Sequence, residues 1–82
     1  MSDKIDVVSM FKQAAFEVDG RTLEGLTLDT KLSELSLDSV AVMETIGFFE
    51  QRLEIRFNDD DLARLSSLRD LEMLIDKARK GA

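Results

Sequence analysis

Ser39 is the residue of this sequence whose setting best suits covalent chemistry. It stands between Asp38 and Val40 at the start of a segment with helical periodicity, so we expect its hydroxyl to be accessible. The 82 residues contain no histidine and no cysteine. A Ser-His-Asp relay is therefore excluded, because that relay needs an imidazole to take the hydroxyl proton. Either another protein modifies Ser39, or it is an ordinary serine at the beginning of a helix.

The run Asn58-Asp59-Asp60-Asp61 is the second place that suggests chemistry. It lacks the alternating ligands, the central glycine and the distal glutamate of an EF-hand loop. The N-terminus of a short helix explains it better, since Asn58 can cap and the carboxylates complement the helix dipole. We expect no metal site here, and no pair of carboxylates is marked out for acid–base catalysis.

Charge limits the partners that this chain can have. It carries 11 Lys and Arg against 17 Asp and Glu, a net charge of -6. We expect no nucleic-acid partner, because phosphate contacts need clustered cations. A protein with a basic docking patch fits better, although acidity alone also keeps a small protein soluble. We see neither a membrane-spanning run nor a signal peptide, so we expect a cytoplasmic protein without membrane association.

The elements that must position Ser39 follow from the apolar periodicity. It predicts an all-α fold, a single domain over residues 1–82, with three main helices, one short helix and a long structured loop. We expect the helices at residues 3–18, 39–53, from 58 onward and 67–81. The loop over residues 26–38 should be pinned to the core by its leucines, with a helical turn at Ser33-Glu34-Leu35.

Each expected helix has an apolar stripe that predicts its buried face. The predicted core residues are Ile5, Val8, Phe11 and Ala15, then Val42, Ile46, Phe49 and Leu53, then Leu62 and Leu65, and finally Leu68, Leu71, Leu74, Ile75 and Ala78. On the helix at 39–53, Val40, Glu44, Gly47 and Gln51 point away from the stripe, and Met43 flanks them. Apolar side chains off the stripe, with Phe48 among them, indicate either a docking surface or ordinary scattered surface residues.

In this order, the features resemble an acyl carrier protein. The resemblance lies in the loop LTLDTKLSELSLDSV and the following VMETIGFFEQRLEIRFNDDDLARLSSLRDLEMLI. It implies that Ser39 receives 4'-phosphopantetheine from coenzyme A through a separate transferase, with Asp38 as the motif aspartate. The thiol of that arm would hold acyl groups as thioesters, so the chain itself would be a carrier and not an enzyme.

The resemblance also implies partners and the surface that they touch. The partners would be a phosphopantetheinyl transferase, an acyl-loading enzyme and ketosynthase-type biosynthetic enzymes, and the carrier would be a monomer. Val40, Met43 and Gly47 match outward positions that touch partner enzymes. Glu44 and Glu50 match acidic positions that meet basic patches.

Several positions depart from the pattern of fatty-acid carriers. Ala41, Gln51 and Arg52 stand where acidic residues are usual, Gly47 replaces a larger apolar residue, and Asn58 replaces a proline. The less acidic second helix predicts a carrier for a specialised pathway, polyketide-like or mixed. Two alternatives stay open: an aminoacyl or peptidyl carrier, and a carrier-like interaction protein in which Ser39 is an unmodified helix cap.

Overall fold

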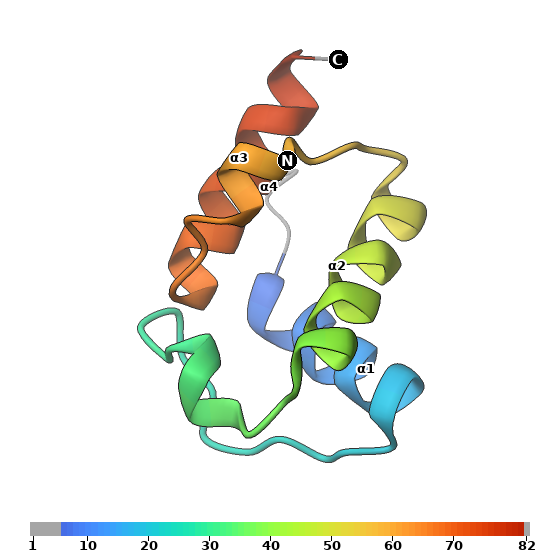
Figure 1. Ribbon diagram of the computed structural model, residues 1–82, viewed down its shortest axis with the longest axis vertical. Coiled ribbons are helices and arrows are strands. Elements are labelled where there is room, and N and C mark those ends of the chain that lie inside the picture. Colours follow the sequence, from blue (N-terminus) through green and yellow to red (C-terminus); the bar gives the residue numbers. More distant parts are fainter. Residues whose placement is uncertain (1–5, 82) are drawn as a thin grey trace.

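The computed structural model describes residues 6–81, which fold into four α-helices and one 3-10 helix (Figure 1). These are α1 (Val7–Asp19), η1 (Leu32–Leu35), α2 (Ser39–Leu53), α3 (Asp59–Leu62) and α4 (Leu68–Gly81). No strand forms within residues 6–81. Lys31 and Ser67 form an isolated antiparallel β-bridge. The predicted all-α class is confirmed, whereas the extent of the domain over residues 1–82 stays a prediction.

The first helix starts later than its periodicity predicts. Asp6 has an extended backbone and is the N-cap, so α1 begins at Val7 and the predicted start at Asp3 is wrong. The Asp6 carboxylate accepts hydrogen bonds from the Ser9 amide (3.2 Å) and the Ser9 hydroxyl (2.9 Å), which hold the pKa of Asp6 below its ordinary value. Of the predicted core residues, Ile5 lies outside the described part of the chain. At the other end, Gly20 takes a left-handed backbone (φ 65°) and stops the helix.

The core lies where α1, α2 and α4 meet. Phe11 and Phe49 are fully buried, with ring centroids 6.3 Å apart and tilted by 43°. Leu68 and Leu71 bury the first turns of α4 against the same cluster. Burial of this kind stabilises a small domain by roughly 1.5–3 kcal/mol for each large apolar side chain.

The buried arcs of α1 and α2 differ from the predicted stripes. Val7 and Ala14 are buried on α1, while the predicted Val8 is half-buried at the edge of the core. On α2, Ala41 and Thr45 are buried with the predicted Ile46 and Phe49, whereas the predicted Val42 and Leu53 are half-buried at the edge of the core. Ala14, Ala41 and Thr45 escape an apolar-stripe analysis because their side chains are small and contribute little hydrophobicity of their own. The buried Thr45 hydroxyl is satisfied, since it donates to the Ala41 carbonyl at 2.8 Å.

A long loop joins α1 to α2 and is fastened to the start of α4 (Figure 1). The Leu32 amide donates to the Ser66 carbonyl (2.8 Å), and the Arg69 amide donates to the Leu28 carbonyl (2.8 Å). Asp29 and Arg69 add an ion pair at 3.0 Å. The loop leucines pack against the core, namely Leu23, Leu26, Leu28, Leu32, Leu35 and Leu37. The predicted leucine-pinned loop is confirmed, and its helical turn is η1.

The two C-terminal helices begin at the predicted caps. The Asn58 side chain accepts from the Asp60 amide (3.3 Å) and precedes α3. Before α4, the Ser67 hydroxyl accepts from the Asp70 amide (3.4 Å) while the Asp70 carboxylate accepts from the Ser67 amide (3.1 Å). This reciprocal pair satisfies helix N–H groups that would otherwise lack acceptors.

Candidate functional site

Ser39 is the first residue of α2, but Asp38 caps the helix. The Asp38 backbone is extended (φ -79°, ψ 174°), and its carboxylate accepts a hydrogen bond from the Ala41 amide at 2.7 Å. Ser39 is exposed, and its hydroxyl makes no hydrogen bond within residues 6–81. The interpretation of Ser39 as the helix cap is therefore wrong. The signal was present in the sequence, because aspartate ranks with serine among the preferred N-cap residues.

The chain enters α2 through a tight turn that leucines hold in place. Leu35 is buried at the end of η1, and Leu37 is half-buried against the core. Between them Ser36 has a left-handed backbone (φ 58°) and ends η1. The two anchored leucines thus set the place from which Asp38 and Ser39 project.

The surroundings of Ser39 suit an anionic substituent. The backbone amides of Ser39 and Val40 donate to no acceptor within the described part of the chain. They lie at the positive end of the dipole of α2, where a phosphate group is stabilised. An exposed, unpartnered hydroxyl beside two free amides therefore fits a phosphodiester attached at Ser39.

Next to Ser39, the outward face of α2 combines apolar side chains with one carboxylate. Val40 is 67% exposed and Met43 is 57% exposed. Glu44 is exposed and forms no ion pair within residues 6–81. Gly47 is half-buried, yet nothing lies within 4 Å of the place that a Cβ atom would take. Together with the exposed Gln51, these residues form a surface that we call the α2 face.

Two other candidate docking residues on α2 instead make contacts within this protein. Glu50 is half-buried, and its carboxylate accepts a hydrogen bond from the Phe57 amide at 2.9 Å, so it holds the connector to α3. Phe48 is half-buried against the core, and the Arg52 guanidinium lies 4.7 Å from its ring centroid. Neither side chain lies free on the surface as Met43 does, and helical spacing alone did not reveal these contacts.

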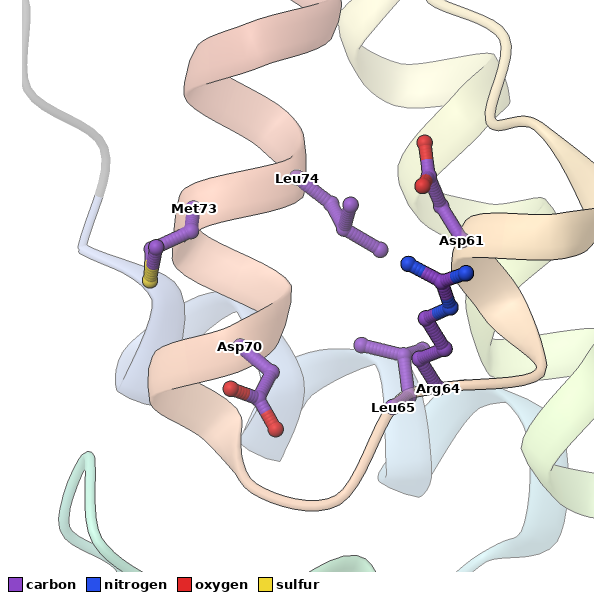
Figure 2. Close-up of a pocket in the computed structure, with 6 residues that line it drawn as sticks. All are labelled: Asp61, Arg64, Leu65, Asp70, Met73 and Leu74. Atoms are coloured by element: carbon purple, nitrogen blue, oxygen red, sulfur yellow. The ribbon is translucent and has the colours of Figure 1, made fainter.

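Away from Ser39, a shallow pocket of about 150 Å³ lies between α3 and α4 (Figure 2). Arg64 and Leu65 line it from the segment after α3, and Met73 and Leu74 line it from α4. A second pocket, of about 240 Å³, lies beside Arg56 and Lys77. No group of three potential metal ligands gathers within the described residues, and none of their helices is long and apolar enough to cross a membrane.

Comparison with known proteins agrees with this geometry. Residues 11–75 match the family model described as phosphopantetheine attachment site. The chain is 36% identical over 66 residues to the actinorhodin polyketide synthase acyl carrier protein of Streptomyces coelicolor, which covers 80% of this chain and 77% of that protein. Its fold is similar to the crystal structure of an acyl carrier protein from Thermotoga maritima, with a TM-score of 0.83 and 25% identity over 92% of this chain and 88% of that one.

The chain belongs to the phosphopantetheine attachment family, as residues 11–75 show. Its function is that of an acyl carrier protein, and its prosthetic group is 4'-phosphopantetheine. The predicted family, function and cofactor are therefore confirmed. Members of this family are carriers that work with biosynthetic enzymes.

Proposed function

We propose that the Ser39 hydroxyl is the attachment point of 4'-phosphopantetheine and that the chain carries acyl groups for a polyketide-type pathway. This proposal is supported above all by the different roles of Asp38 and Ser39 at the start of α2. Because Asp38 supplies the cap, the Ser39 hydroxyl is left exposed and has no hydrogen-bond partner within residues 6–81. A hydroxyl in that state is accessible to a modifying enzyme.

The attachment requires a separate transferase, because this chain has no imidazole to activate Ser39. The Ser39 oxygen forms a bond to the phosphorus of coenzyme A that bears the pantetheine arm. The pyrophosphate bond breaks, adenosine 3',5'-bisphosphate leaves, and the hydroxyl proton passes to a base of the transferase. When bound, the group supplies a thiol that holds acyl groups as thioesters. The chain itself catalyses nothing, acts as a monomer and works in the cytoplasm.

The α2 face is the surface at which partner enzymes dock in this proposal. Val40 and Met43 supply exposed apolar contact next to Ser39, and Glu44, which forms no ion pair in the described part of the chain, supplies a carboxylate for a basic patch. Gly47 extends the same surface. Glu50 contributes less, since its carboxylate already accepts the Phe57 amide. The partners are a phosphopantetheinyl transferase, an acyl-loading enzyme and ketosynthase-type enzymes.

The similarity to the actinorhodin polyketide synthase acyl carrier protein supports acyl cargo over aminoacyl cargo. An aminoacyl or peptidyl carrier would also hold its cargo on a serine-linked arm, so the attachment chemistry does not separate the two. The two kinds of carrier are distinguished by incubating the protein that bears the phosphopantetheine arm, but no cargo, with a malonyl-loading enzyme and separately with an aminoacyl-adenylating enzyme. We expect the first to charge the arm and the second to leave it free.

Intact mass after incubation with coenzyme A and a broad-specificity phosphopantetheinyl transferase tests the attachment site. We expect the wild-type chain to gain one phosphopantetheinyl group and Ser39→Ala to gain none. Ser33→Ala is the matched control, because Ser33 is another exposed serine a short distance before the site. If Ser39→Ala is still modified, or if Ser33→Ala is not, the assignment of Ser39 fails.

A further inference from the structure

The pocket beside Arg56 contains hydrogen-bond donors that the protein itself does not use. It lies where the connector after α2 meets α3 and α4, and it is lined by Arg56, Phe57, Asn58, Asp61, Leu74, Lys77 and Ala78. The Arg56 side chain is exposed and makes neither a hydrogen bond nor an ion pair within residues 6–81. The N–H groups of its guanidinium are therefore available to a ligand.

Asn58 and Lys77 add further donors to this pocket. The Asn58 side-chain oxygen accepts the Asp60 amide (3.3 Å), while its NH2 group donates to no acceptor in the described part of the chain. The Lys77 Nζ atom lies 3.2 Å from the Asp61 carboxylate, the one carboxylate among the lining residues. Two cations thus outweigh one carboxylate, in a chain whose net charge is -6. This local excess of positive charge favours an anionic ligand.

The backbone that carries Arg56 is held in place, and an apolar surface lies beside it. Ile55 is buried just before Arg56, and the Phe57 amide just after it donates to the Glu50 carboxylate at 2.9 Å. A site whose groups are already in place loses less conformational freedom when a ligand binds. The half-buried side chains of Phe57 and Leu74 supply apolar lining. Apolar lining with a few converging polar groups is typical of small-molecule sites.

We infer that this pocket binds a small free carboxylic acid, with its carboxylate between Arg56 and Lys77 and its aliphatic part against Phe57 and Leu74. A guanidinium matches a carboxylate through two parallel N–H···O bonds, which is why arginine suits this ligand. The pocket volume of about 240 Å³ admits about eight non-hydrogen atoms, since a water molecule takes about 30 Å³. Hexanoate is an acid of that size.

This binding site is separate from the attachment site. Ser39 lies at the opposite end of the 15-residue helix α2, about 20 Å from the connector. A ligand in the pocket therefore leaves the α2 face uncovered. Hydrolysis of a thioester releases a free acid, so the ligand would be a by-product of the cargo. That last link rests on the proposed function, whereas the binding itself does not.

The test titrates hexanoate into isotope-labelled Ser39→Ala protein and follows the backbone amide signals by NMR. This variant cannot carry the arm at Ser39, so the result does not depend on attachment there. We expect saturable shifts at the amides of Asn58, Lys77 and Ala78, with a dissociation constant of about 1 mM. Hexanol has the same chain length without the charge, and it should bind at least about tenfold more weakly.

Adding Arg56→Gln should weaken hexanoate binding about tenfold, as the loss of a charge-assisted hydrogen bond does. The matched control is Arg64→Gln, because Arg64 is another exposed arginine without an ion pair within residues 6–81, and it lines the neighbouring pocket. The control should leave the affinity unchanged, and melting curves should show that both variants are folded.

Three results would overturn this inference and leave the attachment proposal standing. Equal weakening by Arg56→Gln and Arg64→Gln would show that hexanoate responds only to the overall charge. Equal affinity for hexanol would show that the cations play no part. Equal shifts with inorganic phosphate would show a general anion site that does not use its apolar lining.

Discussion

Asp38 and Ser39 are neighbouring residues with separate tasks at the start of α2. The Asp38 carboxylate caps the helix by accepting a hydrogen bond from the Ala41 amide, while the Ser39 hydroxyl makes no hydrogen bond within residues 6–81. If one side chain both capped the helix and carried the arm, its modification would remove the capping hydrogen bond. The division therefore leaves the helix end intact whether or not Ser39 is modified.

This division predicts unequal effects of two alanine substitutions. Asp38→Ala should lower the free energy of unfolding by about 1 kcal/mol through loss of the cap. Ser39→Ala should change it by less than about 0.5 kcal/mol, as an exposed residue without a hydrogen bond does. Urea denaturation measures both values. Asp38→Asn is the control that should restore most of the stability, since asparagine also caps, and equal losses for the two alanine variants would contradict the assignment.

Two helices end in the same left-handed backbone conformation but use different residues to do so. Gly20 follows α1 with φ 65°, and Glu54 follows α2 with φ 56°. The Glu54 amide donates to the Glu50 carbonyl, so the left-handed turn satisfies a carbonyl at the helix end. A residue with a Cβ atom is strained there, whereas glycine is not.

Substitutions at the C-terminal ends of α1 and α2 should therefore change the stability in opposite directions. Glu54→Gly relieves about 1 kcal/mol of strain and loses part of that to the greater entropy of the unfolded chain, so we expect a net gain of about 0.5 kcal/mol. Gly20→Ala should destabilise by about 1 kcal/mol, with no contribution from crowding because nothing lies within 4 Å of the added carbon. Thermal melts of both variants check this, and a stable Gly20→Ala would show that the end of α1 can rearrange.

At the scale of the whole molecule, the loop between α1 and α2 connects the site to α4. Backbone hydrogen bonds to Ser66 and Arg69 and the Asp29–Arg69 ion pair hold the middle of the loop against the start of α4. Closer to α2, the buried side chain of Leu35 anchors the loop in the core. The position of Ser39 thus depends on contacts that lie far apart in the sequence.

The contributions of these contacts should differ in size. Asp29 and Arg69 are both exposed, so Asp29→Ala should cost less than about 1 kcal/mol, and less still in high salt. Leu35→Ala should cost about 2–3 kcal/mol, because it removes a buried side chain from the core. Urea denaturation at low and high salt compares them. A larger loss for Asp29→Ala than for Leu35→Ala would mean that the ion pair, and not burial, holds the loop.

Much of this fold follows from local sequence. The 3.6-residue period predicted α2 from Ser39 to Leu53 as the structure has it, and Asn58 and Ser67 marked the starts of α3 and α4. Caps and periodicity act between residues a few positions apart, so they are visible in the sequence. The start of α1 was missed because Ile5 shares the apolar period of the helix, whereas Asp6 has an extended backbone and caps the helix that begins at Val7.

The sequence by itself determined the all-α class, the exclusion of a serine–histidine relay, the Asp38-Ser39 pair and the outward direction of Val40, Met43 and Glu44. Both Asp38 and Ser39 were possible caps from the sequence, and the structure showed that Asp38 is the cap and that the Ser39 hydroxyl makes no hydrogen bond within residues 6–81. It also decided that Glu50 holds the connector and that no neighbour crowds Gly47. The physical reason is that periodicity gives the direction of a side chain, whereas its partners depend on which segments the fold brings beside it.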